Sequence, residues 1–141
     1  MNPEDAELLA RLNEGKIVQI SPRGISMLPF IHCGHDKVRL RKDANVAVGD
    51  IVLAYYQDHL ILHRIYAIEG ERFILMGDGN LKGNEVVDRS DVWGKAIGIV
   101  KENGRCQKPH KARFWRHTLP LRRIMLKIRR KWYKLRNLNP E

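Results

Sequence analysis

The sequence predicts a mostly β domain built of hairpins, with a short helix before it and a basic amphipathic helix after it. Several segments alternate apolar and polar residues between short turns rich in Gly, Asp and Asn, which is typical of antiparallel strands. Basic residues gather at the carboxyl end, where the apolar residues change to a helical spacing. We therefore divide the chain into an N-terminal helix (1–15), a β domain (16–104) and a basic amphipathic tail (105–141).

Length and composition fit one globular domain with an appendage. Of the 141 residues, 43% are apolar and 30% are charged, as in water-soluble domains. No window approaches the roughly 20 consecutive apolar residues of a membrane-spanning helix. The first five residues lack the basic-then-apolar order of a secretory signal. We expect the chain to stay on the cytoplasmic side.

Local signals define the individual elements. Acidic residues in the first turn and Asn13-Glu14-Gly15 at the end predict a helix over 4–13. Gly94, Ala96 and Gly98 give the last strand three small positions, which indicates close backbone packing. Alternation of apolar and polar residues predicts strands at 16–20 and 37–41. Short strand-like segments joined by tight turns predict further strands at 51–56, 59–68, 72–76 and 92–100.

Three residue types needed by a serine nucleophile occur in short motifs. Ser26 lies in the turn Gly24-Ile25-Ser26-Met27-Leu28-Pro29, His63 in the apolar run 60–65, and Asp78 in Gly77-Asp78-Gly79-Asn80. An imidazole can take the proton of the serine hydroxyl, and a carboxylate can orient the imidazole. Strand alternation puts His63 on the same face as Ile61 and Ile65.

These motifs, together with the V-G-D-I-V segment 48–52, resemble the superfamily of type I signal peptidases and LexA-like peptidases over roughly residues 17–100. Residue 63 is His where most members have Lys, so the chain is most similar to the histidine-type (SipW-like) signal peptidases. The resemblance implies a compact LexA/signal-peptidase-like β-fold. It also implies a serine endopeptidase that hydrolyses a peptide or protein substrate, with Ser26 as nucleophile and His63 as general base.

The acid that would orient His63 is open between two candidates. Asp78 is the first. In the histidine-type enzymes a further acid follows the G-D-x-N motif closely, whereas here Glu85 and Asp88 lie further on, and we take Asp88 as the second candidate. Lys95 is a weaker alternative for the base. Asp50 is interpreted as a turn residue that accepts hydrogen bonds from nearby backbone N–H groups.

The residues around Ser26 are the predicted oxyanion and substrate-binding positions. Many signal peptidases have a serine two residues before the nucleophile, where this chain has Gly24. Backbone N–H groups would then stabilise the oxyanion. The predicted positions are Gly24, Ile25, Met27 and Pro29.

No metal or other cofactor is expected. Cys33 and Cys106 are isolated thiols without a C-x-x-C motif, so they indicate neither a disulfide framework nor a zinc site. His32, Cys33 and His35 are too close in sequence for all three to face one ion readily, and we interpret that segment as a loop.

The tail predicts a membrane-surface helix. Between Lys108 and Arg136 there are twelve Lys or Arg and no Asp or Glu, which exceeds the formal charge of +10 of the whole chain. Apolar residues at 121, 124, 125, 128, 132 and 135 form one helical stripe, as in helices that lie on anionic membranes. The predicted contacts with the inner face of the membrane are Arg122, Arg123, Lys127, Arg130, Lys131 and Trp132.

Two alternatives remain for the tail and one for the whole chain. The stripe could dock on the β domain or on a partner protein. Nucleic acid is disfavoured because no DNA-binding or RNA-binding motif accompanies the charge. For the whole chain, the alternative to a peptidase is a catalytically inactive module that keeps the fold and binds peptides or a membrane surface.

Overall fold

The structure, a computed structural model, describes residues 1–22, 31, 35–77, 85–109, 127–128 and 131. Strands of a single antiparallel sheet make up the largest share of these residues, so the predicted mostly β class and the short helix before it are confirmed. In chain order the elements are α1 (Pro3–Asn13), β1 (Val18–Ile20), β2 (Lys37–Arg41), β3 (Ile51–Tyr56), β4 (His59–Glu69), β5 (Arg72–Met76), β6 (Glu85–Asp88), the 3₁₀ helix η1 (Arg89–Asp91), β7 (Val92–Val100) and β8 (Cys106–Gln107).

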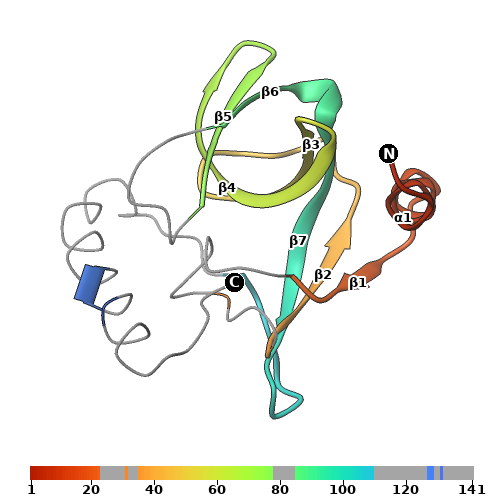
Figure 1. Ribbon diagram of the computed structural model, residues 1–141, viewed down its shortest axis with the longest axis vertical. Helices are drawn as coiled ribbons and strands as arrows, with labels where there is room; N and C mark the ends of the chain where they lie inside the picture. The colour runs from red at the N-terminus through yellow and green to blue at the C-terminus, as the bar shows by residue number, and fades with distance from the viewer. Residues whose placement is uncertain (23–30, 32–34, 78–84, 110–126, 129–130, 132–141) are drawn as a thin grey trace.

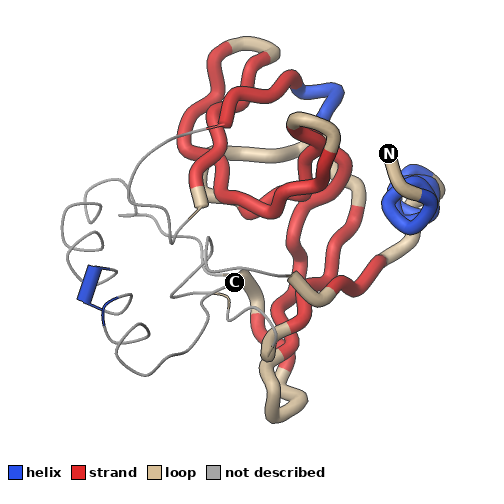
Figure 2. The backbone as a smooth tube through the Cα atoms, viewed as in Figure 1, coloured by secondary structure: helices blue, strands red, loops and turns tan. Residues whose placement is uncertain are grey.

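The sheet curls on itself at one end. Its strand order is β1-β2-β7-β3-β4-β5-β6, and β8 pairs with the end of β7. The consecutive strands β3 to β6 form a half-barrel, in which β6 returns to lie near β3 (Figure 1). From the half-barrel β7 runs alongside β2 to the opposite end of the molecule, where the loop to β8 begins (Figure 2). β7 therefore connects the half-barrel to the flatter part of the sheet, because it pairs with β3 on one side and with β2 on the other.

One apolar cluster covers each of the two faces of this sheet. The first lies between α1 and the sheet and includes Leu12, Leu40 and Leu53. The second consists of side chains from β3 to β6, such as Val52 and Phe73, and fills the half-barrel. Because side chains alternate along a strand, β3 contributes Leu53 to the first cluster and its neighbour Val52 to the second.

The helix α1 begins one residue before the predicted start and ends at the predicted residue. The side chain of Asn2 accepts a hydrogen bond from the backbone N–H of Asp5 at 2.7 Å, and Pro3 follows in the first turn, where its missing N–H costs nothing. Leu12 is completely buried against β7. A Cβ atom added at Gly94 would lie 3.3 Å from Leu12 Cδ1. The small residue predicted there thus lets the helix approach the sheet closely.

Replacing Gly94 with valine is expected to lower the free energy of unfolding by about 1–3 kcal/mol, because the added methyl groups would overlap Leu12. Urea denaturation measures the loss. The double variant Gly94→Val with Leu12→Ala should lose less than the sum of the two single losses, since the smaller side chain makes room. Strictly additive losses would contradict this contact.

Some elements differ from the sequence prediction. The strands at 37–41, 51–56, 72–76 and 92–100 have the predicted bounds, whereas β1 is shorter and β4 extends to Glu69. The strands β6 and β8 were not predicted. Because β8 pairs with β7, the sheet continues two residues into the segment that we assigned to the tail.

The predicted C-terminal helix lies outside the described residues apart from 127, 128 and 131. Of the predicted membrane-surface residues, Lys127 and Lys131 are described, and both are exposed. Within the described part of the chain, no helix has the length and apolar character needed to cross a bilayer. The remaining predicted membrane-surface residues, Arg122, Arg123, Arg130 and Trp132, lie outside the described residues.

Candidate functional site

His63 faces the interior of the half-barrel from β4. The two turn residues between β3 and β4, Gln57 and Asp58, have φ angles of 47° and 64°, as a tight hairpin turn requires. This turn sets the register in which His63 pairs with Val52 of β3. Ile65, on the same side of β4 as His63, belongs to the second cluster. The predicted apolar face is therefore confirmed, and His63 itself is only 6% exposed.

Among the described residues, Glu85 is the acid that contacts His63. It opens β6 and pairs with Leu75 of β5, which in turn pairs with Ile65 of β4. Glu85 is therefore in line with Ile65 across the sheet. His63 is two positions before Ile65 on the same face of β4, so the carboxylate of Glu85 can reach its imidazole. The distance between His63 Nδ1 and Glu85 Oε2 is 2.8 Å, and the side chains are 8% and 19% exposed.

The contact decides which ring nitrogen can act as a base. A carboxylate oxygen accepts hydrogen bonds, so the Nδ1 of a neutral His63 carries the proton and donates it to Glu85. The lone pair then lies on Nε2, which has no hydrogen-bond partner among the described residues. An imidazole in this state can take a proton at Nε2, and the carboxylate stabilises the imidazolium that results.

Asp88, the second candidate for this role, does not contact His63 in the structure. Side chains alternate along β6, so Glu85 and Val87 face the half-barrel while Asp88 faces outward and is exposed. Asp88 is also three residues further along the strand, about 10 Å from Glu85. In the register of the sheet it pairs with Arg72.

Most of the predicted nucleophile site lies outside the described residues. The serine segment falls between Pro22 and Ile31, and the first candidate acid falls between Gly77 and Glu85. Ile31 is fully buried in the first cluster. The predicted site residues outside the described part are Ser26, Asp78, Gly24, Ile25, Met27 and Pro29.

Lys95 is held by acids rather than by the histidine. Its Nζ lies 3.4 Å from Asp50 Oδ2 and 3.9 Å from Asp43 Oδ2. Lys95 pairs with Val52, and Val52 pairs with His63, so one strand separates the lysine from the imidazole. This arrangement gives the weaker alternative for the base no support. The interpretation of Asp50 is confirmed, since its Oδ2 accepts a hydrogen bond from the Ala47 N–H at 2.9 Å.

The described residues offer no obvious place for a metal. Among them, no group of three or more His, Cys, Asp or Glu side chains could hold an ion. Cys106 is a free, exposed thiol near Arg39, and Cys33 lies outside the described residues.

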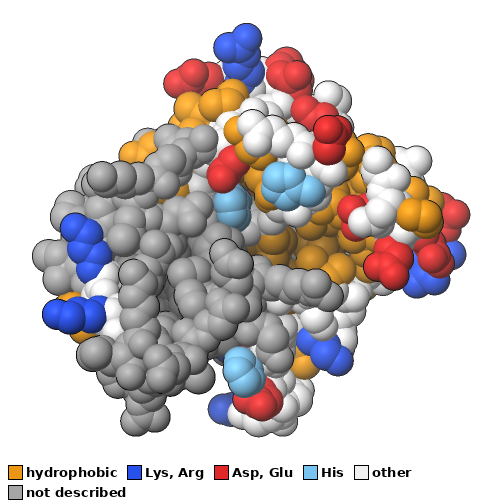
Figure 3. Space-filling view, in the orientation of Figure 1, with side chains coloured by type: hydrophobic (Ala, Val, Ile, Leu, Met, Phe, Trp, Pro, Cys, Tyr) orange, Lys and Arg blue, Asp and Glu red, His pale blue; other side chains and the backbone are white. Residues whose placement is uncertain are grey.

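An apolar hollow lies on the face drawn in Figure 3. Hydrophobic side chains are open to solvent between the half-barrel and α1, and acidic side chains stand on both sides of them. The first cluster has partly buried members on three of the elements around this face, namely Leu8 of α1, Ile20 of β1 and Leu60 of β4. Side chains of an extended ligand could pack on such a surface.

No protein-family model matches the chain, and no curated protein matches it in sequence.

Proposed function

We propose that the chain is a serine endopeptidase of the signal-peptidase and LexA-like type, with Ser26 as nucleophile, His63 as general base and Glu85 as the acid that orients His63. The observation that carries the proposal is the buried contact of 2.8 Å between His63 and Glu85. We assign Ser26 as the nucleophile from the order of the sequence motifs. Glu85 replaces Asp88 in this role.

In the first half of the reaction, Ser26 Oγ bonds to the carbonyl carbon of the peptide while its proton passes to His63 Nε2. Backbone N–H groups near Ser26 stabilise the oxyanion. The C–N bond then breaks, and His63 returns the proton to the leaving amine. In the second half a water molecule gives a proton to His63 while its oxygen attacks the acyl carbon. His63 then returns that proton to Ser26 Oγ as the ester bond breaks, which releases the carboxylic acid product and restores the serine hydroxyl.

The burial of the pair supports a functional role over a merely structural one. The half-barrel holds a cluster of buried apolar side chains from the described residues, such as Phe73 and Leu75. Burying an imidazole and a carboxylate costs more desolvation free energy than burying apolar groups of similar volume. A sequence selected for stability alone would gain by replacing His63 and Glu85, whereas a general base needs both.

We further propose that the substrate binds as an extended peptide along β1. In the described sheet β1 is an end strand that pairs with β2 on one side only, so its other side can accept backbone hydrogen bonds from a peptide. β1 ends at Ile20, shortly before the segment that contains Ser26. The apolar hollow beside it would receive apolar substrate side chains.

Labelling with a fluorophosphonate tests the proposal. Such probes react with a serine whose hydroxyl is activated by a base. We expect the probe to modify Ser26 in the wild-type chain, as identified by mass spectrometry of the peptides, and to leave Ser26→Ala unmodified. The wild-type chain should also cleave peptides of a peptide library, and Ser26→Ala should cleave none of them. Without labelling or serine-dependent cleavage, the chain would be the inactive binding module.

A further inference from the structure

A largely buried ion pair joins Lys95 of β7 to Asp50, in the turn that precedes β3. Asp50 and Lys95 have side chains that are 5% and 21% exposed, and Lys95 Nζ lies 3.4 Å from Asp50 Oδ2. The same Nζ is 3.5 Å from the backbone carbonyl oxygen of Asn45. Since Lys95 belongs to β7, this one ammonium group ties the loop that leads into β3 to the neighbouring strand.

The turn that this ion pair holds is bonded to β4 immediately after His63. The Gly49 N–H donates to the Ile65 carbonyl at 2.9 Å, and the Ile65 N–H donates to the Asp50 carbonyl at 2.8 Å. The guanidinium of Arg64, which is completely buried, donates from Nη1 to the Gly49 carbonyl at 2.6 Å. The two residues that follow His63 are therefore both fixed to residues 49 and 50.

We propose that Asp50, held by Lys95, is a positioning residue for His63, and this inference rests on the proposed function. Asp50 does not touch the imidazole. Cross-strand neighbours are about 5 Å apart, which puts the backbone of Lys95 roughly 10 Å from that of His63 across Val52. The ion pair acts through the 49–50 turn, which fixes residues 64 and 65 and thereby the distance from His63 to Glu85.

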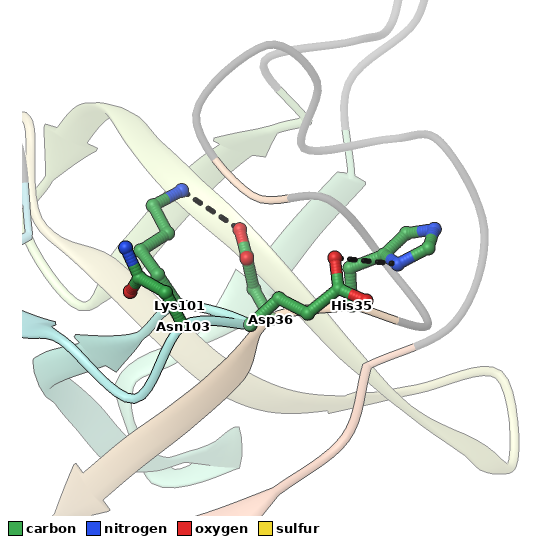
Figure 4. A pocket seen from close by; sticks show the side chains of 5 residues that line it. His35, Asp36, Lys101 and Asn103 are labelled. Carbon is green, nitrogen blue, oxygen red and sulfur yellow. Dashed lines mark hydrogen bonds and ion pairs between the residues drawn. The ribbon is translucent and has the colours of Figure 1, made fainter.

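A second ion pair of the same kind provides a matched control. Lys101 Nζ lies 2.8 Å from Asp36 Oδ2, with the side chains 28% and 4% exposed. Figure 4 shows the two side chains pointing toward one another, beside His35. This pair joins the segment before β2 to the loop after β7, at the end of the molecule opposite the half-barrel (Figure 1). Removing its charge should cost stability without moving His63.

The test compares Asp50→Asn with Asp36→Asn in the full chain. The amide introduced by Asp50→Asn keeps the shape of the carboxylate but loses the ion pair with Lys95. We expect kcat for peptide hydrolysis to fall about tenfold to a hundredfold in Asp50→Asn, with KM changed less than about twofold, because a small displacement of the base slows the chemical step. Lys95→Gln is the second variant, for use if Asp50→Asn does not fold.

A proton–nitrogen NMR spectrum of the imidazoles gives a readout that does not need activity. The Nδ1 proton of His63, assigned by its loss in His63→Ala, reports the hydrogen bond to Glu85. It should shift or broaden in Asp50→Asn and stay in place in Asp36→Asn. An unmoved signal in Asp50→Asn, or an equal shift in Asp36→Asn, overturns the proposal.

Different results would overturn the peptidase proposal and the positioning role of Asp50. If the wild type is active, a kcat within about twofold of wild type in Asp50→Asn overturns the positioning role, whatever the NMR signal shows. If no Ser26-dependent hydrolysis is found, the peptidase proposal fails. The NMR comparison then still decides whether Asp50 positions His63.

Discussion

Replacing His63 with alanine is expected to lower kcat/KM for peptide hydrolysis by about a thousandfold or more, because the serine hydroxyl then has no base to take its proton. Glu85 would also lose its partner at 2.8 Å, so circular dichroism must first show that the variant is folded. Activity is measured as the initial rate of cleavage of a peptide selected from the library.

His59→Ala is the matched control for this prediction. His59 lies on the same strand, but its side chain is exposed and its Nδ1 contacts the carbonyl of Gln57 at 3.0 Å. We expect this variant to keep its activity within about twofold of wild type. Free imidazole added to His63→Ala should restore part of the rate, since it can occupy the space left by the side chain. Equal losses in the two variants would contradict a special role for His63.

The elements that local patterns define could be predicted from the sequence. Turn residues on either side located the strands at 37–41, 51–56 and 72–76. The strand at 37–41 also alternates apolar and polar residues, because only one of its faces is buried. The alternating direction of side chains along a strand placed His63 on the same face as Ile61 and Ile65. Gly94 could be predicted as a point of close packing because a strand interior rarely has a residue without a side chain unless something packs on it.

The identity of the acid could not be predicted, because it depends on contacts between distant parts of the chain. Glu85 reaches His63 only through the pairing of β6 with β5 and of β5 with β4. The short β6, with acidic residues at both ends, has little pattern of its own. The one usable signal was the two adjacent valines after Glu85, of which Val87 is buried.

The ion pair of Asp50 and Lys95 was missed for the same reason. Asp50 could be recognised as a turn residue from its neighbours, since its hydrogen bond to Ala47 is local. Lys95 lies 45 positions later, and it reaches Asp50 because β7 inserts between β2 and β3. A strand order of this kind is not encoded in any short segment. Isolated titratable residues in strands, such as Lys95 and His63, were the only indication that buried polar contacts would be present.

Replacing Glu85 with glutamine is expected to lower kcat by about a hundredfold to ten-thousandfold, with KM nearly unchanged. The amide has a similar shape but no charge to stabilise the imidazolium. Its NH₂ group can also donate to Nδ1, which favours the tautomer with the proton on Nε2, where it cannot act as a base. The measurement is the steady-state rate of the same peptide, and NMR of the His63 ring nitrogens identifies the tautomer.

Asp88→Asn and Asp78→Asn are the control variants for Glu85→Gln. Asp88 is exposed on the outer face of β6, so its variant should behave as wild type. Asp78, the first candidate from the sequence, would be the orienting acid if its variant lost activity while Glu85→Gln kept it. Because Glu85 and His63 are already in contact, we expect the opposite order of effects. A Glu85→Gln variant with full activity would leave the buried pair with a purely structural role.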